Sequence, residues 1–198
     1  MRLSQLRTAE GSRRVAAVLD NGAVLVPGAD SVYALAMEAA ARGTSLVEAV
    51  TARIREAGAA PVDLEAAYRE GRLLVPLDHP DPARTFVTGT GLTHLGSAEG
   101  RDKMHKDMAD PAKQTDSMRM FRLGLEGGKP AGGGPGAQPE WFYKGDGSAI
   151  AQPGAPLAAP AFALDGGEEP EIVGLYVIAD DGTPRRVGFA LGNEFSDH

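Results

Sequence analysis

Two long apolar runs joined by a short turn constrain the later part of the chain more than any other feature. Residues 171–179 read EIVGLYVIA, residues 185–195 read RRVGFALGNEF, and a turn sequence, Asp-Asp-Gly-Thr, separates them. Such runs around turn-forming residues predict an antiparallel β-hairpin. With further strands expected in TFVTGTG (85–91) and EWFYKGDGS (140–148), the later half should be rich in β-structure with long loops.

The first eighty residues predict a small α+β domain. Asn21-Gly22 between two apolar runs is a strong signal for a β-hairpin. A helix over 31–43 ending at a glycine, a second helix over 45–57 opened by a capping box of Ser45 and Glu48, a third capped by Asp63, and a strand over 73–75 should follow. Prolines at 76, 80 and 82 then mark a loop between domains.

We therefore expect an α+β protein with two domains, residues 1–80 and residues 84–198. Within the second domain, residues 117–125 predict a helix, and the polar stretch before it is helical or irregular. The segment GGKPAGGGPGAQP (127–139) is too rich in glycine and proline to pack as regular structure. It predicts either a flexible lid or a passive surface loop.

Composition excludes several classes of function. The formal net charge of −7, without a basic stripe, argues against nucleic acid as a partner. The absence of cysteine excludes disulfides, zinc–thiolate sites and a cysteine nucleophile. The N-terminus has no apolar run typical of a signal peptide, and no stretch approaches the ~20 apolar residues of a membrane helix. We expect a cytoplasmic protein with no membrane association.

Three carboxylates are the strongest candidate site. Glu169 and Glu171 are two residues apart in an extended segment, so their side chains should lie on one face, and Pro170 keeps the chain extended between them. Glu194, at the far end of the returning strand, is at a distance from the turn similar to that of Glu171, so the two should approach each other. Oxygen ligands without cysteine favour a hard cation, Mg²⁺, Mn²⁺ or Ca²⁺. The alternative is a solvated acidic strand end.

Three further residues have side chains suited to catalysis or substrate binding. His94 follows a glycine-rich turn and is either a general acid or base or a hydrogen-bonded structural residue. Lys144, between an aromatic strand and a tight turn, either binds a substrate carboxylate or is a surface lysine. Arg101 is a candidate substrate contact from a lid.

In combination, these segments resemble the fumarylacetoacetate hydrolase family. The matching motifs over about residues 84–198 are GTGLTH around His94, WFYKGDGS around Lys144, EEPEI at Glu169 and Glu171, and LGNEFS around Glu194. The sequence is most similar to the sugar-acid branch of that family, the GguC-like proteins. The resemblance implies a rolled mixed β-sheet around the metal, and a homodimer.

The resemblance also assigns roles to residues. Glu169, Glu171 and Glu194 take the three metal-ligand positions. The last replaces the usual Asp, so Asp197 is a further candidate ligand. Lys144 takes the place of the substrate-binding lysine, and His94 that of the histidine that moves protons. A complete family member continues past residue 198, so we expect this chain to be the front part of a longer protein and inactive by itself.

The implied substrate is a 2-oxo acid, specifically a 2-keto-3-deoxy sugar acid from arabinonate or rhamnonate. A divalent cation would act as a Lewis acid and stabilise an enolate. Loss of a β-hydroxyl from the enolate would be dehydration, and attack of water on a γ-carbonyl would be C–C hydrolysis. The residues named above are compatible with both reactions. The alternative from another class is a non-catalytic fragment or a module that binds metal or a small acid without turnover.

Overall fold

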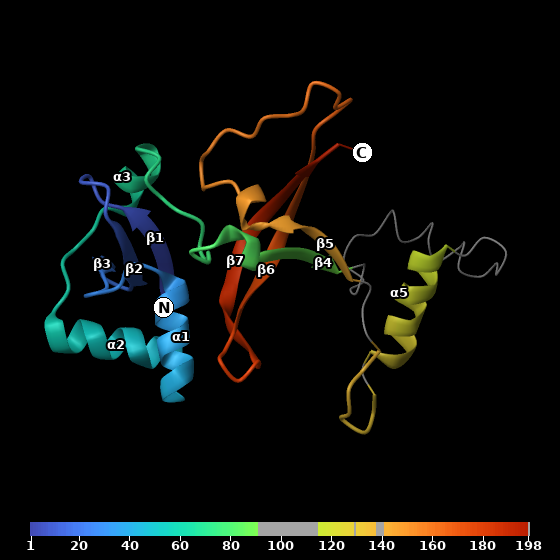
Figure 1. Ribbon diagram of the computed structural model, residues 1–198, viewed down its shortest axis with the longest axis horizontal. Coiled ribbons are helices and arrows are strands. Elements are labelled where there is room, and N and C mark those ends of the chain that lie inside the picture. Colours follow the sequence, from blue (N-terminus) through green and yellow to red (C-terminus); the bar gives the residue numbers. More distant parts are fainter. Residues whose placement is uncertain (91–114, 129, 138–140, 198) are drawn as a thin grey trace. The chain divides into compact units, whose positions relative to one another are not determined.

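The computed structural model describes residues 1–90, 115–128, 130–137 and 141–197 (Figure 1). By packing, the chain divides into two compact units. The first unit joins residues 1–82 to residues 148–198, and the second unit holds residues 83–147. The two domains expected at 1–80 and 84–198 stay a prediction. His94 and Arg101 lie outside the described residues.

The first unit begins with a three-stranded antiparallel sheet of order β1-β2-β3. Its strands are β1 (Arg2–Arg7), β2 (Arg13–Leu19) and β3 (Gly22–Leu25). The pairing of Leu19 with Gly22 closes the hairpin predicted around Asn21-Gly22, which is confirmed. β1 was not predicted, because its polar and charged residues obscure the alternation of buried and exposed positions; one of these residues, Gln5, is fully buried.

Three helices follow, and local signals set where they begin and end. α1 (Val32–Arg42) ends at Gly43, whose φ of 65° lies in the left-handed region that favours glycine. α2 (Leu46–Ala57) begins with the predicted capping box of Ser45 and Glu48, and Asp63 caps α3 (Leu64–Arg69). All three helices are confirmed.

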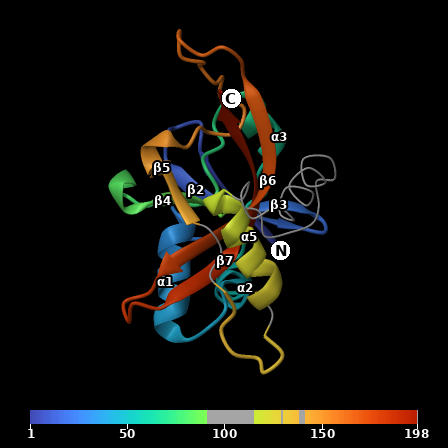
Figure 2. The same cartoon turned by 90° about the vertical axis from the view of Figure 1, so that its right-hand side faces the viewer.

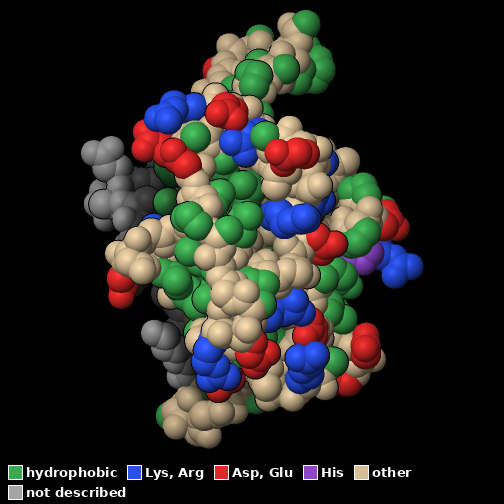
Figure 3. All heavy atoms as spheres, turned by 90° about the vertical axis from the view of Figure 1, so that its left-hand side faces the viewer, with side chains coloured by type: hydrophobic (Ala, Val, Ile, Leu, Met, Phe, Trp, Pro, Cys, Tyr) green, Lys and Arg blue, Asp and Glu red, His purple; other side chains and the backbone are tan. Residues whose placement is uncertain are grey.

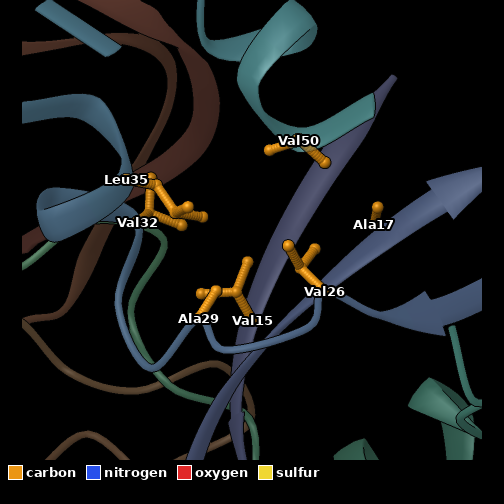
Figure 4. Close-up of a cluster of buried hydrophobic side chains, with 7 residues drawn as sticks. All are labelled: Val15, Ala17, Val26, Ala29, Val32, Leu35 and Val50. Atoms are coloured by element: carbon orange, nitrogen blue, oxygen red, sulfur yellow. The ribbon is translucent and has the colours of Figure 1, made fainter. Parts of the chain in front are cut away.

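The larger core cluster of the first unit lies between the sheet and the helices α1 and α2 (Figure 4). It is built from seven buried side chains: Val15, Ala17, Val26, Ala29, Val32, Leu35 and Val50. Burying such side chains stabilises a fold by roughly 1.5–3 kcal/mol each, so this cluster is the main source of stability here. On the face shown in Figure 3, acidic and basic side chains are interspersed.

The strand predicted over Leu73–Val75 is wrong, because only an isolated bridge joins Leu73 to Leu6. A side-chain network holds this segment instead. Gln5 Nε2 donates to the Val75 carbonyl at 2.7 Å and to Asp78 Oδ1 at 2.9 Å, and Gln5 Oε1 accepts from the Val32 N–H at 2.8 Å. Arg13 pairs with Asp78 at 2.8 Å. The buried glutamine thus uses both ends of its amide to fix the chain that leaves the sheet.

The predicted late hairpin is confirmed as a long two-stranded ribbon, β6 (Gly167–Ile178) and β7 (Pro184–Ser196). Its turn end packs on the N-terminal part of the unit, where Val177 is buried and Val187 contacts the seven-residue core. The long loop before β6 joins the ribbon at the end opposite that turn (Figures 1 and 2).

The second unit contains the antiparallel pair β4 (Phe86–Thr90) and β5 (Trp141–Asp146) and the helix α5 (Asp116–Gly127). Two short 3₁₀ turns, η1 (Pro82–Arg84) and η3 (Gly147–Ala149), lie at its boundaries. These strands and this helix confirm the predictions for their segments. In the glycine-rich stretch 127–139, Gly127 is the last residue of α5, and the other described residues, 128 and 130–137, form neither helix nor strand.

The chain is therefore a mixed α+β protein with several small antiparallel sheets. The single rolled mixed sheet implied by the family resemblance is not formed by the described strands, whose pairings are all antiparallel. Among the described residues, every helix is too short or too polar to cross a membrane.

Candidate metal centre

The ribbon brings three carboxylates together near its open end. Glu169 lies directly opposite Glu194, and Glu171 lies opposite Gly192. One carboxylate oxygen from each of Glu169, Glu171 and Glu194 lies within 4.8 Å of the others. The sequence predicts that Glu194 approaches Glu171, but the residue directly opposite Glu194 is Glu169.

A β-bulge produces this register. Near the turn the pairing runs regularly to Tyr176 opposite Arg186, and the next pair is Leu175 with Gly188. Val187 is the extra residue. Because directly opposed residues of an antiparallel pair share a face, and a shift of one residue exchanges the faces, the bulge puts Glu194 on the face of Glu169. A regular ladder would have put it opposite Glu168, on the other face.

The residues around the three carboxylates leave space for a ligand. Gly192 has no side chain to cover Glu171, and a Cβ there would lie 2.7 Å from Val173 Cγ2. Pro170 cannot donate a hydrogen bond, which suits an open edge of the ribbon. The strand backbone therefore holds Glu169 and Glu171 on one open face.

The charge and the donor atoms of this cluster suit a hard divalent cation. Glu169 and Glu171 are exposed, whereas Glu194 is half-buried and its Oε2 is shielded from solvent. Like charges at such separations repel by about 1 kcal/mol per pair even in water. Metal–oxygen distances of about 2.1 Å for Mg²⁺ and 2.4 Å for Ca²⁺ limit two oxygens on one ion to a separation of about 4.2 Å and 4.8 Å. Oxygens that lie within 4.8 Å of one another meet the limit for Ca²⁺ and come close to that for Mg²⁺.

Asp197, the further candidate ligand, makes a different set of contacts. Its Oδ1 accepts hydrogen bonds from the backbone N–H groups of Leu164 and Asp165, both at 3.0 Å. Among the described residues the gathered carboxylates are the three glutamates alone. Asp197 thus fastens the end of the long loop to the end of β7.

Lys144 lies in the second unit and is also the extra residue of a bulge. In the β4–β5 pair, Val87 lies opposite Gly145 and Thr88 opposite Tyr143, which leaves Lys144 between the two pairs. Its Nζ lies 5.1 Å from the centre of the Phe142 ring. A Cβ at Gly89 would lie 2.5 Å from both Lys144 Cε and Phe142 Cε2, so this glycine provides the space that both side chains use.

Val187 and Gly89 are the residues that sequence reasoning missed. Neither residue has a side chain that can bind a ligand or transfer a proton. Val187 is the extra residue that sets the register of Glu194, and Gly89 leaves space for Lys144. For Val187, the sequence offers one signal, which comes from counting positions from the 180–183 turn. A regular ladder would put Glu194 opposite Glu168, on the face away from Glu169 and Glu171, so β7 needs one extra residue. For Gly89, the sequence gives no signal beyond its place in a glycine-rich turn.

The opposite face of the ribbon is apolar and exposed. Ile172 and Leu191 form a directly opposed pair and are 75% and 89% exposed, and Phe189 is 63% exposed. Along its open half, the ribbon thus has the three clustered glutamates on one face and these exposed apolar side chains on the other.

Comparison with known proteins gives one likeness of fold. No family model matches the sequence, and no curated protein matches it. A solved structure of 2-keto-3-deoxyarabinonate dehydratase, a protein of the fumarylacetoacetate hydrolase family, matches with a TM-score of 0.50 and 18% sequence identity. The match covers 99% of this chain and 57% of that one. The chain is thus similar in fold to part of that enzyme and spans little more than half of its length.

Proposed function

We propose that this chain is part of a divalent-metal-dependent enzyme that acts on a 2-oxo acid. Glu169, Glu171 and Glu194 would hold the cation, Mg²⁺ with Mn²⁺ or Ca²⁺ as substitutes. The observation that carries the proposal is the gathering of three carboxylates within 4.8 Å on one face of the ribbon. The fold likeness to a dehydratase of the same family as the motif resemblance adds support.

When bound, such a cation supplies Lewis acidity and stabilises negative charge that develops on a bound 2-oxo acid. The protein side chains do the rest in this proposal. Lys144 would pair with a substrate carboxylate, and Arg101 would be a further substrate contact. His94, with an ordinary pKa near neutrality for its residue type, would move the proton or orient water.

Between the two reactions left open by the sequence, we propose dehydration of a 2-keto-3-deoxy sugar acid. The proposal rests on the structurally similar enzyme, which is a 2-keto-3-deoxyarabinonate dehydratase. The active form would be a homodimer, to which these 198 residues contribute the metal-binding ribbon.

A second candidate is binding of metal or a small acid without turnover. The observation that favours it is the exposure of Glu169 and Glu171, because catalysis through developing charge gains most where water is excluded. Turnover separates the two candidates, since both predict metal binding.

The test is conversion of 2-keto-3-deoxyarabinonate with and without Mg²⁺, followed by identification of the product. Dehydration that requires Mg²⁺ and is lost in Glu171→Gln supports the dehydratase. Metal binding without conversion, in the chain alone and in any longer protein that contains it, favours the binding module. Conversion that does not depend on the carboxylates contradicts both.

A further inference from the structure

The β7 strand contains one more residue than β6 between the turn and the carboxylates. On the turn side of the bulge the pairs run from Ile178 with Pro184 to Tyr176 with Arg186, and beyond it they run from Leu175 with Gly188 to Gly167 with Ser196. Val187 alone lacks a partner in the ladder. Everything at the open end of the ribbon, including the carboxylate cluster, depends on where this extra residue sits.

A competing arrangement of the same sequence is easy to specify. If Val187 entered the ladder opposite Leu175, each later residue of β7 would move one position along β6. Glu194 would then face Glu168, and Ile172 would pair with Ala190 in place of Leu191. Because side chains alternate between faces, this slip would remove Glu194 from the cluster and bring the apolar residues of β7 to the acidic face.

The bulge makes a tertiary contact with the N-terminal core. Val187 is half-buried and packs against the cluster formed by Val15, Val32, Val50 and their neighbours. The slipped ribbon has no bulge and therefore avoids the free-energy cost of leaving one residue of the ladder unpaired. Val187 makes this contact from the unpaired position, so the contact can offset the cost of the bulge.

We infer that Val187 is a positioning residue: its packing against the N-terminal core holds the bulge at this point of β7 and so keeps Glu194 beside Glu169 and Glu171. The inference rests on the proposed metal site for its functional meaning, but the register itself can be measured separately. It also gives the N-terminal domain a role, because that domain supplies the surface that selects the register of the site.

Cysteine cross-linking reads the register directly. The chain has no cysteine, so an introduced pair reports only on itself. Ile172→Cys with Leu191→Cys should form a disulfide in the observed register, and Ile172→Cys with Ala190→Cys should form one only in the slipped register. Adding Val187→Ser should weaken the first cross-link and strengthen the second. Unchanged cross-linking in folded Val187→Ser and Val187→Ala chains would overturn the inference.

Metal affinity tests the consequence for the site. Val187→Ser should weaken Mn²⁺ binding about tenfold or more, as loss of a supporting residue does at other metal sites. Deletion of Val187 should largely restore it, because the shortened strand pairs Leu175 with Gly188 and Glu169 with Glu194 without any bulge. A merely structural role predicts the reverse, since deletion removes the same packing and shortens the strand as well.

Val177→Ala is the matched control. Val177 is buried at the same end of the ribbon but lies in the regular ladder opposite Arg185, so its truncation weakens packing without releasing the bulge. Equal loss of Mn²⁺ affinity in Val177→Ala and Val187→Ser, or a deletion variant as weak as Val187→Ser, would overturn the inference. Absence of Mn²⁺ binding in the unaltered chain would refute the proposed metal site, and the cross-links would still decide the register.

Discussion

Glu169 and Glu194 lie directly opposite each other across the β6–β7 ribbon, although they are separated by 24 residues and a turn. With Glu171, two positions along β6, they make a cluster that a hard cation can neutralise. The consequences of this arrangement can be measured one residue at a time.

Glu171→Gln should remove metal-induced stabilisation without unfolding the chain. Glu171 is exposed and opposite a glycine, so its loss breaks no packing, and less repulsion in the cluster should leave the metal-free protein as stable or more stable by up to about 1 kcal/mol. Thermal melts with and without Mn²⁺ measure both quantities. A variant with the unaltered Mn²⁺ response would remove Glu171 from the ligand set.

Gly192→Ala should destabilise the ribbon, and Gly188→Ala should not. A Cβ at Gly192 would lie 2.7 Å from Val173 Cγ2, whereas one at Gly188 meets nothing within 4 Å. Overpacking of this kind typically costs about 1–3 kcal/mol. Denaturant unfolding of both variants compares them, and Val173→Ala should rescue Gly192→Ala. Equal effects of the two alanines would mean that the contact with Val173 is not what matters.

The ion pair between Arg13 and Asp78 should make the first unit sensitive to acid. Burial raises the pKa of Asp78, but the hydrogen bonds from Arg13 and Gln5 outweigh it and hold that pKa below its ordinary value of 3.8. A lowered folded-state pKa contributes stability that is present above the ordinary value and is lost as pH falls through the lowered one.

Asp78→Asn should therefore lower the free energy of unfolding by about 2 kcal/mol at neutral pH. The difference from the parent chain should shrink as the pH falls below about 4. Unfolding free energies of both proteins between pH 2 and 7 measure the difference. A gap that stays constant over this range would show that the carboxylate charge of Asp78 does not contribute.

Lys144→Met should raise the KM for a 2-oxo acid about tenfold or more and leave Mn²⁺ affinity nearly unchanged, because a charged substrate contact is lost and no metal ligand is. Gly89→Ala should act in the same direction. Its Cβ would occupy space within 2.5 Å of Lys144 Cε, so the lysine must move. Steady-state kinetics and Mn²⁺ titration together check this, and a parallel loss of both quantities would make Lys144 structural.

Local signals made much of the fold predictable. Asn21-Gly22, the capping box of Ser45 and Glu48, and Gly43 each act over a few residues, and the structure has the hairpin and helices that they predict. The segment 73–75 was predicted as a strand from its apolar residues alone. Its fixation by Gln5 and Asp78 depends on side chains about 70 residues apart, which no local pattern reveals.

The residues of the candidate site could be predicted from the sequence, but the strand register that brings them together could not. The alternation of Glu169 and Glu171 follows from strand geometry, but the choice of Glu169 as the partner of Glu194 depends on the bulge at Val187. The position of that bulge is set by packing against the N-terminal core, which is a tertiary contact. A valine within an apolar run gives no sign of it.

The most direct test of the account is a calorimetric titration of Mn²⁺ into the unaltered chain, the double variant Glu169→Gln/Glu171→Gln, and Glu168→Gln. Glu168 is the matched control, since it is the adjacent carboxylate on the other face, opposite Phe195. We expect one saturable site in the unaltered chain, none in the double variant, and an affinity within about twofold of the parent in Glu168→Gln. No binding to the folded chain, or equal weakening by Glu168→Gln, would contradict it.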